Sequence, residues 1–176
     1  MKQICLVLTV TVALMACNNN SQTEVAKHGD SATVKTEYAY TTDHPVDWEW
    51  GSTDNIKTAM LALKAFENGD ITECVKYFAD TAVLEFDGFD AKLSRDSIAA
   101  FLKQGREMSK SITIKMDDYE SVRSKDSKAE YVTLWYKQIS EDKTGKKDSV
   151  ECTNDIKFKD GKIVLLNEKT RHYMPK

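Results

Sequence analysis

The sequence predicts an α+β fold, with about three N-terminal helices packed on one face of a curved, mostly antiparallel sheet that encloses a cone. Two patterns and their order along the chain predict this architecture. Apolar residues first recur at helical spacing, and from Ser111 onward they alternate with a period of two. Helices followed by an antiparallel meander are typical of α+β proteins.

Three helices are expected between residues 53 and 108. The first begins at a cap formed by Thr53 or Asp54 and ends at Asn68-Gly69. Its apolar positions have helical spacing: Ile56, Met60, Leu63 and Phe66. A short second helix starts at Asp70, and Ser94 begins the cap of a third. Between the second and third helices we expect a strand over 81–86, a turn at Asp87-Gly88 and a brief partner strand over 91–93.

Four further strands follow the third helix. Alternation of apolar and polar residues predicts them over 112–116, 131–136, 150–158 and 163–167. Polar and glycine-containing segments at 124–127, 143–146 and 160–161 separate them and are typical of hairpin turns. The strands are therefore expected to pair in sequence order.

The N-terminus resembles a bacterial lipoprotein signal. Lys2 precedes an apolar run from Ile4 to Met15, and Leu14-Met15-Ala16 leads into Cys17. The run is shorter than the roughly 20 residues that a membrane span needs, and its length is typical of a signal peptide. The resemblance implies that residues 1–16 are a signal peptide and that Cys17 carries the lipid.

These features predict three segments and a location. Residues 17–51 would be a lipidated cysteine with a polar, flexible tether, and residues 52–176 a folded domain. The protein is expected to be exported to the bacterial cell envelope and to contact a membrane through lipidated Cys17. The sequence does not indicate which membrane, inner or outer, holds it.

Charge and composition weigh against several other partners. The chain has 25 basic and 28 acidic residues, a net charge of −3, with both signs interspersed. Nucleic-acid-binding proteins show a clustered basic surface, so no nucleic acid is expected as a partner. His28, His44 and His172 are scattered, and no Cys/His spacing resembles a metal site. No metal and no cofactor are expected.

Two cysteines belong to the predicted domain. Cys74 lies on a predicted helix and Cys152 on a predicted strand. An exported compartment permits a disulfide, but free cysteine is among the most buried residue types. Two buried core thiols are favoured over a bridge.

Aromatic residues alternate just before the domain, at Trp48 and Trp50. Two interpretations fit this pattern. The segment is an edge strand packed on the domain, or it is a lid over the mouth of a ligand site, since tryptophan combines a large apolar ring with an N–H donor.

One long segment carries a family resemblance. Residues 62–87, with Asn68-Gly69-Asp70 between two helices and Phe78-Ala79-Asp80 before a strand, look like the family of nuclear transport factor 2, SnoaL-like polyketide cyclases and ketosteroid isomerases. Residues 157–164 are similar to that family's last hairpin. The likeness covers the region from Ser52 to Tyr173. It implies a cone that different members use for catalysis, ligand binding or dimerisation, so the fold does not settle function.

Comparison with ketosteroid isomerases predicts no catalytic residues of that type. Their helix tyrosine, general base and second acid fall at positions that match Ala62, Phe86 and Asn154. Proton abstraction needs a carboxylate in an apolar pocket, and Ala62 and Phe86 supply only surface. Asp155 would be the acid of a cyclase-like mechanism if it pointed inward, although alternation with Ile156 directs it outward.

The cone would then offer an apolar pocket with a few polar groups. The expected pocket residues are Ala62, Phe66, Leu84, Phe86, Trp135, Asn154 and Ile156. A cone filled by its own side chains is an equal alternative. Trp135 and Tyr136 must lie on opposite faces of one strand, and an aromatic on the outer sheet face suggests a homodimer contact.

Three functions remain open at this stage. The leading one is a non-catalytic, membrane-anchored domain that binds a small apolar ligand or a partner protein. The second is an isomerase, cyclase or hydrolase that uses an inward acid, and the third is a structural, dimerising envelope protein.

Overall fold

The three predicted helices and the curved, mostly antiparallel sheet are confirmed by the computed structural model, which describes residues 39–41 and 47–172. The helices are α1 (Thr53–Asn68), α2 (Ile71–Val75) and α3 (Arg95–Glu107). The strands are β1 (Trp48–Trp50), β2 (Phe78–Phe86), β3 (Phe89–Ser94), β4 (Ser109–Ser124), β5 (Glu130–Asp142), β6 (Lys147–Lys159) and β7 (Lys162–His172). All of them belong to one compact unit, Thr41–Lys176. The predicted signal segment 1–16 and Cys17 lie outside the described residues.

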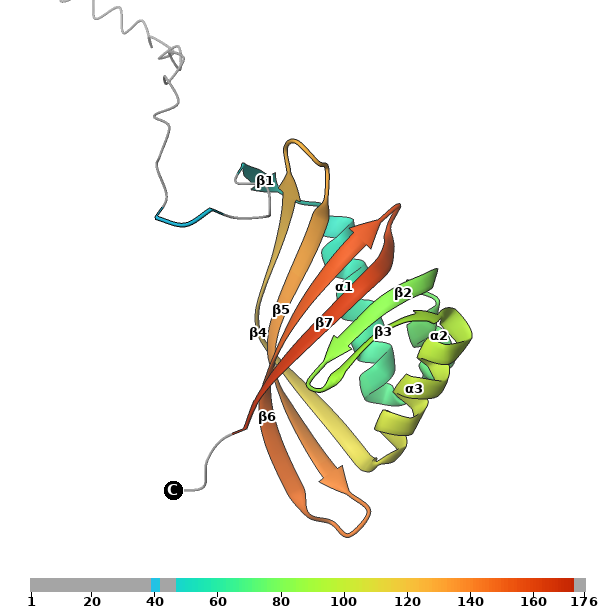
Figure 1. Ribbon diagram of the computed structural model, residues 1–176. Coiled ribbons are helices and arrows are strands. Elements are labelled where there is room, and N and C mark those ends of the chain that lie inside the picture. The colour runs from blue at the N-terminus through green and yellow to red at the C-terminus, as the bar shows by residue number, and fades with distance from the viewer. Residues whose placement is uncertain (1–38, 42–46, 173–176) are drawn as a thin grey trace, which may run out of the picture. The chain divides into compact units, whose positions relative to one another are not determined.

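The seven described strands form one sheet in the order β1-β4-β5-β6-β7-β2-β3. Strands β4 to β7 pair antiparallel in sequence order, as the hairpin signals predicted. Strand β2 pairs parallel to β7, which places the β2–β3 hairpin beside the last strand of the meander. Figure 1 shows the helices on one side of the strongly twisted sheet.

Side-chain and glycine caps define the helix ends. Ser52, rather than the predicted Thr53 or Asp54, caps α1, and its hydroxyl accepts from the backbone N–H groups of Asp54 and Asn55. Gly69 ends the helix with φ at 81°, a left-handed conformation that favours glycine. Asp70 and Ser94 cap α2 and α3, in agreement with the sequence. No helix in the described ranges is both long and apolar enough to cross a bilayer.

Helix α1 crosses the concave face of the sheet with small side chains. Its buried positions are Asn55, Ala59, Ala62 and Ala65. Opposite them, β5 presents Val132 and Leu134, both without exposed surface. Because an alanine side chain is a single methyl group, this helix face fills less of the space above the sheet than leucine or phenylalanine would.

Irregularities in β4 and β7 change which residues face the helices. In β4 the pairing shifts between Ser109 and Ser111 and again between Met116 and Asp118, and each shift inserts one extra residue into the strand. In β7 the pairing moves from Ile163 opposite Phe158 to Leu165 opposite Lys157, so Val164 is the extra residue. A bulge of this kind bends the strand and reverses the alternation of inward and outward side chains beyond it.

Strand β1 corrects two predictions about the N-terminal side of the domain. It pairs antiparallel with β4, Trp48 opposite Ser124 and Trp50 opposite Val122, so the segment assigned to the tether (17–51) includes part of the sheet. Gly51 also donates its backbone N–H to the Ser121 carbonyl at 2.9 Å. The folded domain therefore begins before Ser52.

The two tryptophans of β1 do not form a lid. Trp48 packs edge-on against Tyr131, with 6.0 Å between ring centroids. Tyr131 alternates with buried Val132, so this contact lies on the face of the sheet away from the helices. Trp50 is 85% exposed. The edge-strand interpretation describes this segment, and the lid interpretation is wrong because pairing with β4 turns both rings to the outer face.

Candidate functional site

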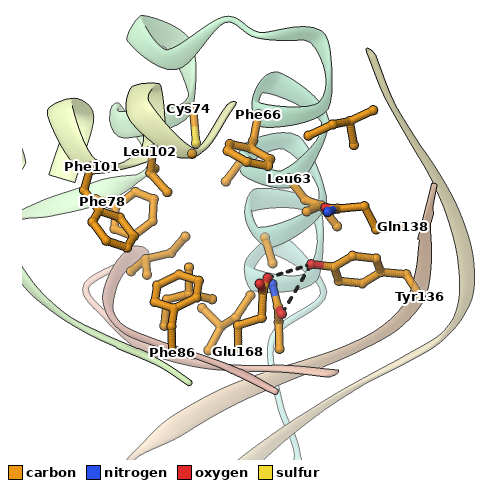
Figure 2. Close-up of a pocket in the computed structure, with 18 of the residues that line it drawn as sticks. Leu63, Phe66, Cys74, Phe78, Phe86, Phe101, Leu102, Tyr136, Gln138 and Glu168 are labelled. Atoms are coloured by element: carbon orange, nitrogen blue, oxygen red, sulfur yellow. Dashed lines mark hydrogen bonds between the residues drawn. The ribbon is translucent and has the colours of Figure 1, made fainter. Parts of the chain in front are cut away.

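A cavity of about 290 Å³ lies between the helices and the concave face of the sheet. Its walls come from α1, α2, α3, β2 and the inner faces of β4, β5, β6 and β7. The volume lies just below the range typical of small-molecule sites, about 300–1,000 Å³. Figure 2 shows the side chains arranged around this open space.

Five of the seven predicted pocket residues line the cavity: Ala62, Phe66, Phe86, Asn154 and Ile156. Leu84 does not, although it is fully buried in the adjacent core. The cone is thus partly filled by its own side chains and partly hollow, so each of the two alternatives left open by the sequence describes part of the interior.

Trp135 was wrongly assigned to the pocket. Alternation along β5 is fixed by Val132 and Leu134, which point into the core, and therefore places Tyr136 and Gln138 on the cavity side. Trp135 lies half-buried on the outer face, where it pairs with Asp118 of β4 and Thr153 of β6. The sequence contained the two adjacent aromatics but did not show which one faces inward.

Aromatic rings form the apolar end of the cavity. Figure 2 places Phe66, Phe78, Phe86 and Phe101 around the side of the space opposite Tyr136. Phe86 and Phe101 contact each other with 5.4 Å between centroids, and Phe101 stacks on Phe89 at 4.6 Å. Such ring contacts hold the apolar wall in a defined position.

Three polar side chains on adjacent strands form the other end. The Tyr136 hydroxyl of β5 donates toward a Glu168 carboxylate oxygen at 3.0 Å and toward Asn154 Oδ1 at 3.3 Å. Asn154 of β6 lies directly opposite Glu168 of β7 in the strand pairing. The three inward side chains meet because neighbouring strands present them on the same face. We call Tyr136, Asn154 and Glu168 the polar cluster.

The cavity changes the proton affinity of this cluster. Burial raises the pKa of Glu168 above its ordinary value, while its hydrogen bonds with Tyr136 and Asn154 act in the opposite direction. Burial, together with the nearby Glu168 carboxylate, also raises the pKa of Tyr136 well above its ordinary range. Tyr136 therefore keeps its proton at neutral pH and acts as the donor to Glu168.

Glu168 was not among the residues that the sequence singled out. The predicted last strand ended at Asn167, whereas β7 runs to His172. Strict alternation from inward Ile163 would also have placed Glu168 on the outer face. The extra residue, Val164, shifts the alternation by one, so Glu168 faces the cavity. No pattern in the sequence marks that bulge.

Asp155 does not face the cavity. Thr133 Oγ1 donates to it at 3.0 Å and the Lys169 ammonium lies 2.7 Å away, all on the outer face of the sheet. The possibility that Asp155 is an inward catalytic acid is therefore contradicted, because Asp155 alternates with inward Ile156. The homodimer expected through this outer face stays a prediction.

The two cysteines of the domain are free and buried. Cys74 lines the cavity, and burial raises the pKa of Cys74 and of Cys152 to about 12 each. Both thiols are therefore protonated at neutral pH, which makes them weak nucleophiles and weak metal ligands. Within the described ranges, no group of three or more His, Cys, Asp or Glu side chains is arranged to hold a metal ion.

The raised pKa of Glu168 predicts how stability depends on pH. The folded protein holds this proton more tightly than the unfolded chain, so the stability that the group contributes is present at low pH and is lost as pH rises through the folded-state pKa. Glu168→Gln removes the titration. Thermal melts at acidic and neutral pH give the Tm difference, variant minus unmodified protein. We expect this difference to increase by several degrees from acidic to neutral pH. A Tm difference that stays constant with pH would contradict the buried position of the carboxyl.

Comparison with known proteins places this arrangement in a family. The SnoaL-like domain matches residues 58–166, more than half of the chain. The search of curated protein sequences found no match.

Several solved structures share the fold at low sequence identity. AusH from Aspergillus nidulans is 12% identical, with a TM-score of 0.57 over 73% of this chain and 90% of that one. An LEH-like epoxide hydrolase from M. tuberculosis is 17% identical, with a TM-score of 0.55 over 68% and 84%. Bal32a, from a soil-derived mobile gene cassette, is 22% identical, with a TM-score of 0.54 over 66% and 88%.

At these identities the similarity establishes architecture and leaves the chemistry open. Proteins of this fold include isomerases, hydroxylases, epoxide hydrolases and non-catalytic ligand-binding proteins. With the matched residues spanning α1 to β7, the chain belongs to the SnoaL-like domain family and has the nuclear transport factor 2-like fold.

Proposed function

We propose that the cavity binds a small apolar or amphipathic molecule. The observation that carries this proposal is the combination of an aromatic-lined space of about 290 Å³ with one polar cluster at its end. Small-molecule sites typically have mostly apolar walls and a few polar groups that fix orientation. The rings would contact the apolar body of the ligand, and Tyr136, Asn154 and Glu168 would hold its polar group.

The absence of a side chain at Gly105 leaves room for a ligand to enter the cavity. Gly105 lines the cavity on the last turns of α3 and is exposed, and a Cβ built on it would have nothing within 4 Å. A glycine inside a helix costs about 1 kcal/mol relative to alanine. A side chain at this position would extend into the rim of the cavity.

Native mass spectrometry of the full chain purified from its own host tests binding. We expect a retained small molecule, released on denaturation. Gly105→Leu should reduce the retained fraction severalfold by narrowing the rim, while its Tm stays equal or rises because leucine is the better helix former.

As a matched control, Lys103→Leu changes an exposed position on the same helix that does not line the cavity. It should retain the molecule. A protein that never carries a molecule, with or without the Gly105 substitution, would contradict the proposal.

We also propose that the domain is held at a membrane of the bacterial cell envelope through a lipid on Cys17. The short apolar run before Cys17 and the polar segment after it support this proposal. Acyl-chain burial contributes about 0.8 kcal/mol per CH₂, so a multiply acylated cysteine would give stable anchoring.

Cell fractionation tests the anchor. Cys17→Ser should move the protein from the membrane to the soluble fraction, because the serine hydroxyl does not replace the thiol that carries the lipid. Cys5→Ser changes a cysteine inside the apolar run and should leave the protein in the membrane fraction. Membrane retention of the Cys17→Ser protein would exclude this mode of attachment.

A second candidate function is proton transfer, and the half-buried carboxyl of Glu168 in the cavity favours it. General acids and bases commonly have a pKa moved toward neutrality by burial, and Glu168 lies in an apolar cavity with a hydroxyl donor 3.0 Å away. This chemistry would give Glu168 the role of catalytic carboxyl group that the sequence considered for Asp155. The reaction class would be removal and return of a proton beside a carbonyl group.

Deuterium incorporation tests the second candidate. Phenylbutanone in D₂O, followed by NMR, should exchange its α-protons faster with the protein than without it. The rate should rise with pH as Glu168 loses its proton, since the carboxylate is the base. Glu168→Gln should abolish the acceleration, and Glu120→Gln, an exposed position outside the cavity, should keep it. Equal rates for the two variants would rule out Glu168 as the base.

A further inference from the structure

The cavity contains a carboxyl group without a cationic partner. Among the residues that line it, Glu168 is the one acidic residue, and none is lysine, arginine or histidine. No ion pair found in the described ranges includes Glu168. Basic side chains of the same strand are directed away, since Lys169 pairs with Asp155 and Arg171 with Glu151 on the outer face.

The polar cluster presents mainly acceptors to the cavity. Tyr136 has one hydroxyl proton, which is already directed at Glu168 and Asn154. An ionised carboxylate can accept about four hydrogen bonds, and Tyr136 and Asn154 flank it as donors on the protein side. The remaining accepting capacity of Glu168 and the Asn154 carbonyl oxygen are complementary to a ligand group that donates several hydrogen bonds.

The opposite end of the cavity selects for an apolar body. Figure 2 shows the rings of Phe66, Phe78 and Phe101 across the open space from the Glu168 carboxyl, while Phe86 lies beside it on the neighbouring strand. Aromatic faces pack against hydrocarbon and also tolerate a nearby cation, whereas they repel an anion. A ligand that matches both ends has an apolar body and one cationic donor group.

We propose that the cavity takes a small apolar amine in its protonated form, with the ammonium group against Glu168 and the body among the phenylalanine rings. An ammonium group supplies three donors and the missing positive charge, and a buried charge is stable in a protein interior only when it is paired. A carboxylate ligand would bring a second negative charge beside Glu168 and is excluded by the same argument. This inference rests on the proposed ligand-binding function and specifies its chemical class.

Three probes of one shape test the proposal. Phenylbutylamine, phenylbutanol and phenylbutanoate differ in the charge and donors of the head group and share the apolar body. Calorimetric titration of the full chain at neutral pH should give an affinity for the amine at least about tenfold above that for the alcohol, the lower end of what a hydrogen bond to a charged group contributes. Phenylbutanoate should bind most weakly.

Two glutamate variants separate the role of the carboxyl from general packing. Glu168→Gln keeps the shape and removes the charge, so the amine should lose its advantage while the alcohol binds within about threefold of its original affinity. Alcohol binding within this threefold range shows that the cavity of this variant is intact. Glu120→Gln should leave all three affinities unchanged.

The outcomes distinguish this inference from the function on which it rests. If the alcohol binds as tightly as the amine, or Glu168→Gln keeps the amine preference, the assignment of ligand class is wrong and the proposed ligand binding stands. If none of the three probes binds, both are overturned.

Discussion

The small side chains on the inner face of α1 are the constraint on which the site depends. Ala59 and Ala62 lie over the concave face of the sheet, and both line the cavity. Larger residues at these positions would occupy the same space and join the core formed by Leu84, Val132 and Leu134. Protein interiors are otherwise close-packed, so an open volume of this size has to be maintained by the residues around it. Here the strand curvature and the stacked phenylalanine rings hold the walls apart.

The polar cluster opposes stability within this apolar environment. The half-buried carboxyl group beside Tyr136, Asn154 and hydrocarbon loses part of its hydration, and two neighbouring hydrogen-bonding groups replace only some of it. A leucine at the same position of β7 would pack without that cost. Residues that reduce stability at one place in a well-packed fold are commonly found where the protein binds or reacts. The carboxyl is therefore better explained by function than by folding.

Much of the architecture could be predicted because its signals are local. Helical spacing in residues 56–66, the Asn68-Gly69 stop and the turn at Asp160-Gly161 each act within a few residues, and both turn residues at 160–161 have positive φ. Which residues of a strand face the core is not a local property, since it is set by pairing with distant strands. Trp135 was placed in the pocket, on the wrong face, for this reason. The lid interpretation of Trp48 and Trp50, the alternative to an edge strand, is removed by pairing with β4. Glu168 required knowledge of one extra residue, Val164, whose effect appears only in the register with Phe158. Whether the cone would be filled or hollow depended on side-chain volumes summed across eight elements, which no single stretch of sequence contains.

The incomplete cover that β1 gives to β4 has a consequence for how the domain behaves in a crowded compartment. Pairing with β1 reaches only Val122 to Ser124, so no described strand pairs with the outer edge of the earlier part of β4, where the Glu67 carboxylate accepts from the Ile114 backbone N–H at 3.0 Å. A strand edge without a partner strand is a template onto which other chains can add as strands. This one carries Lys110 and Lys115 on exposed positions and is interrupted at the Met116/Asp118 irregularity, where acidic residues follow. Natural sheets resist the addition of strands by means of charged side chains and irregular strand pairing at their edges. Both features are present here, and they would allow many copies of the domain to be close together without polymerising.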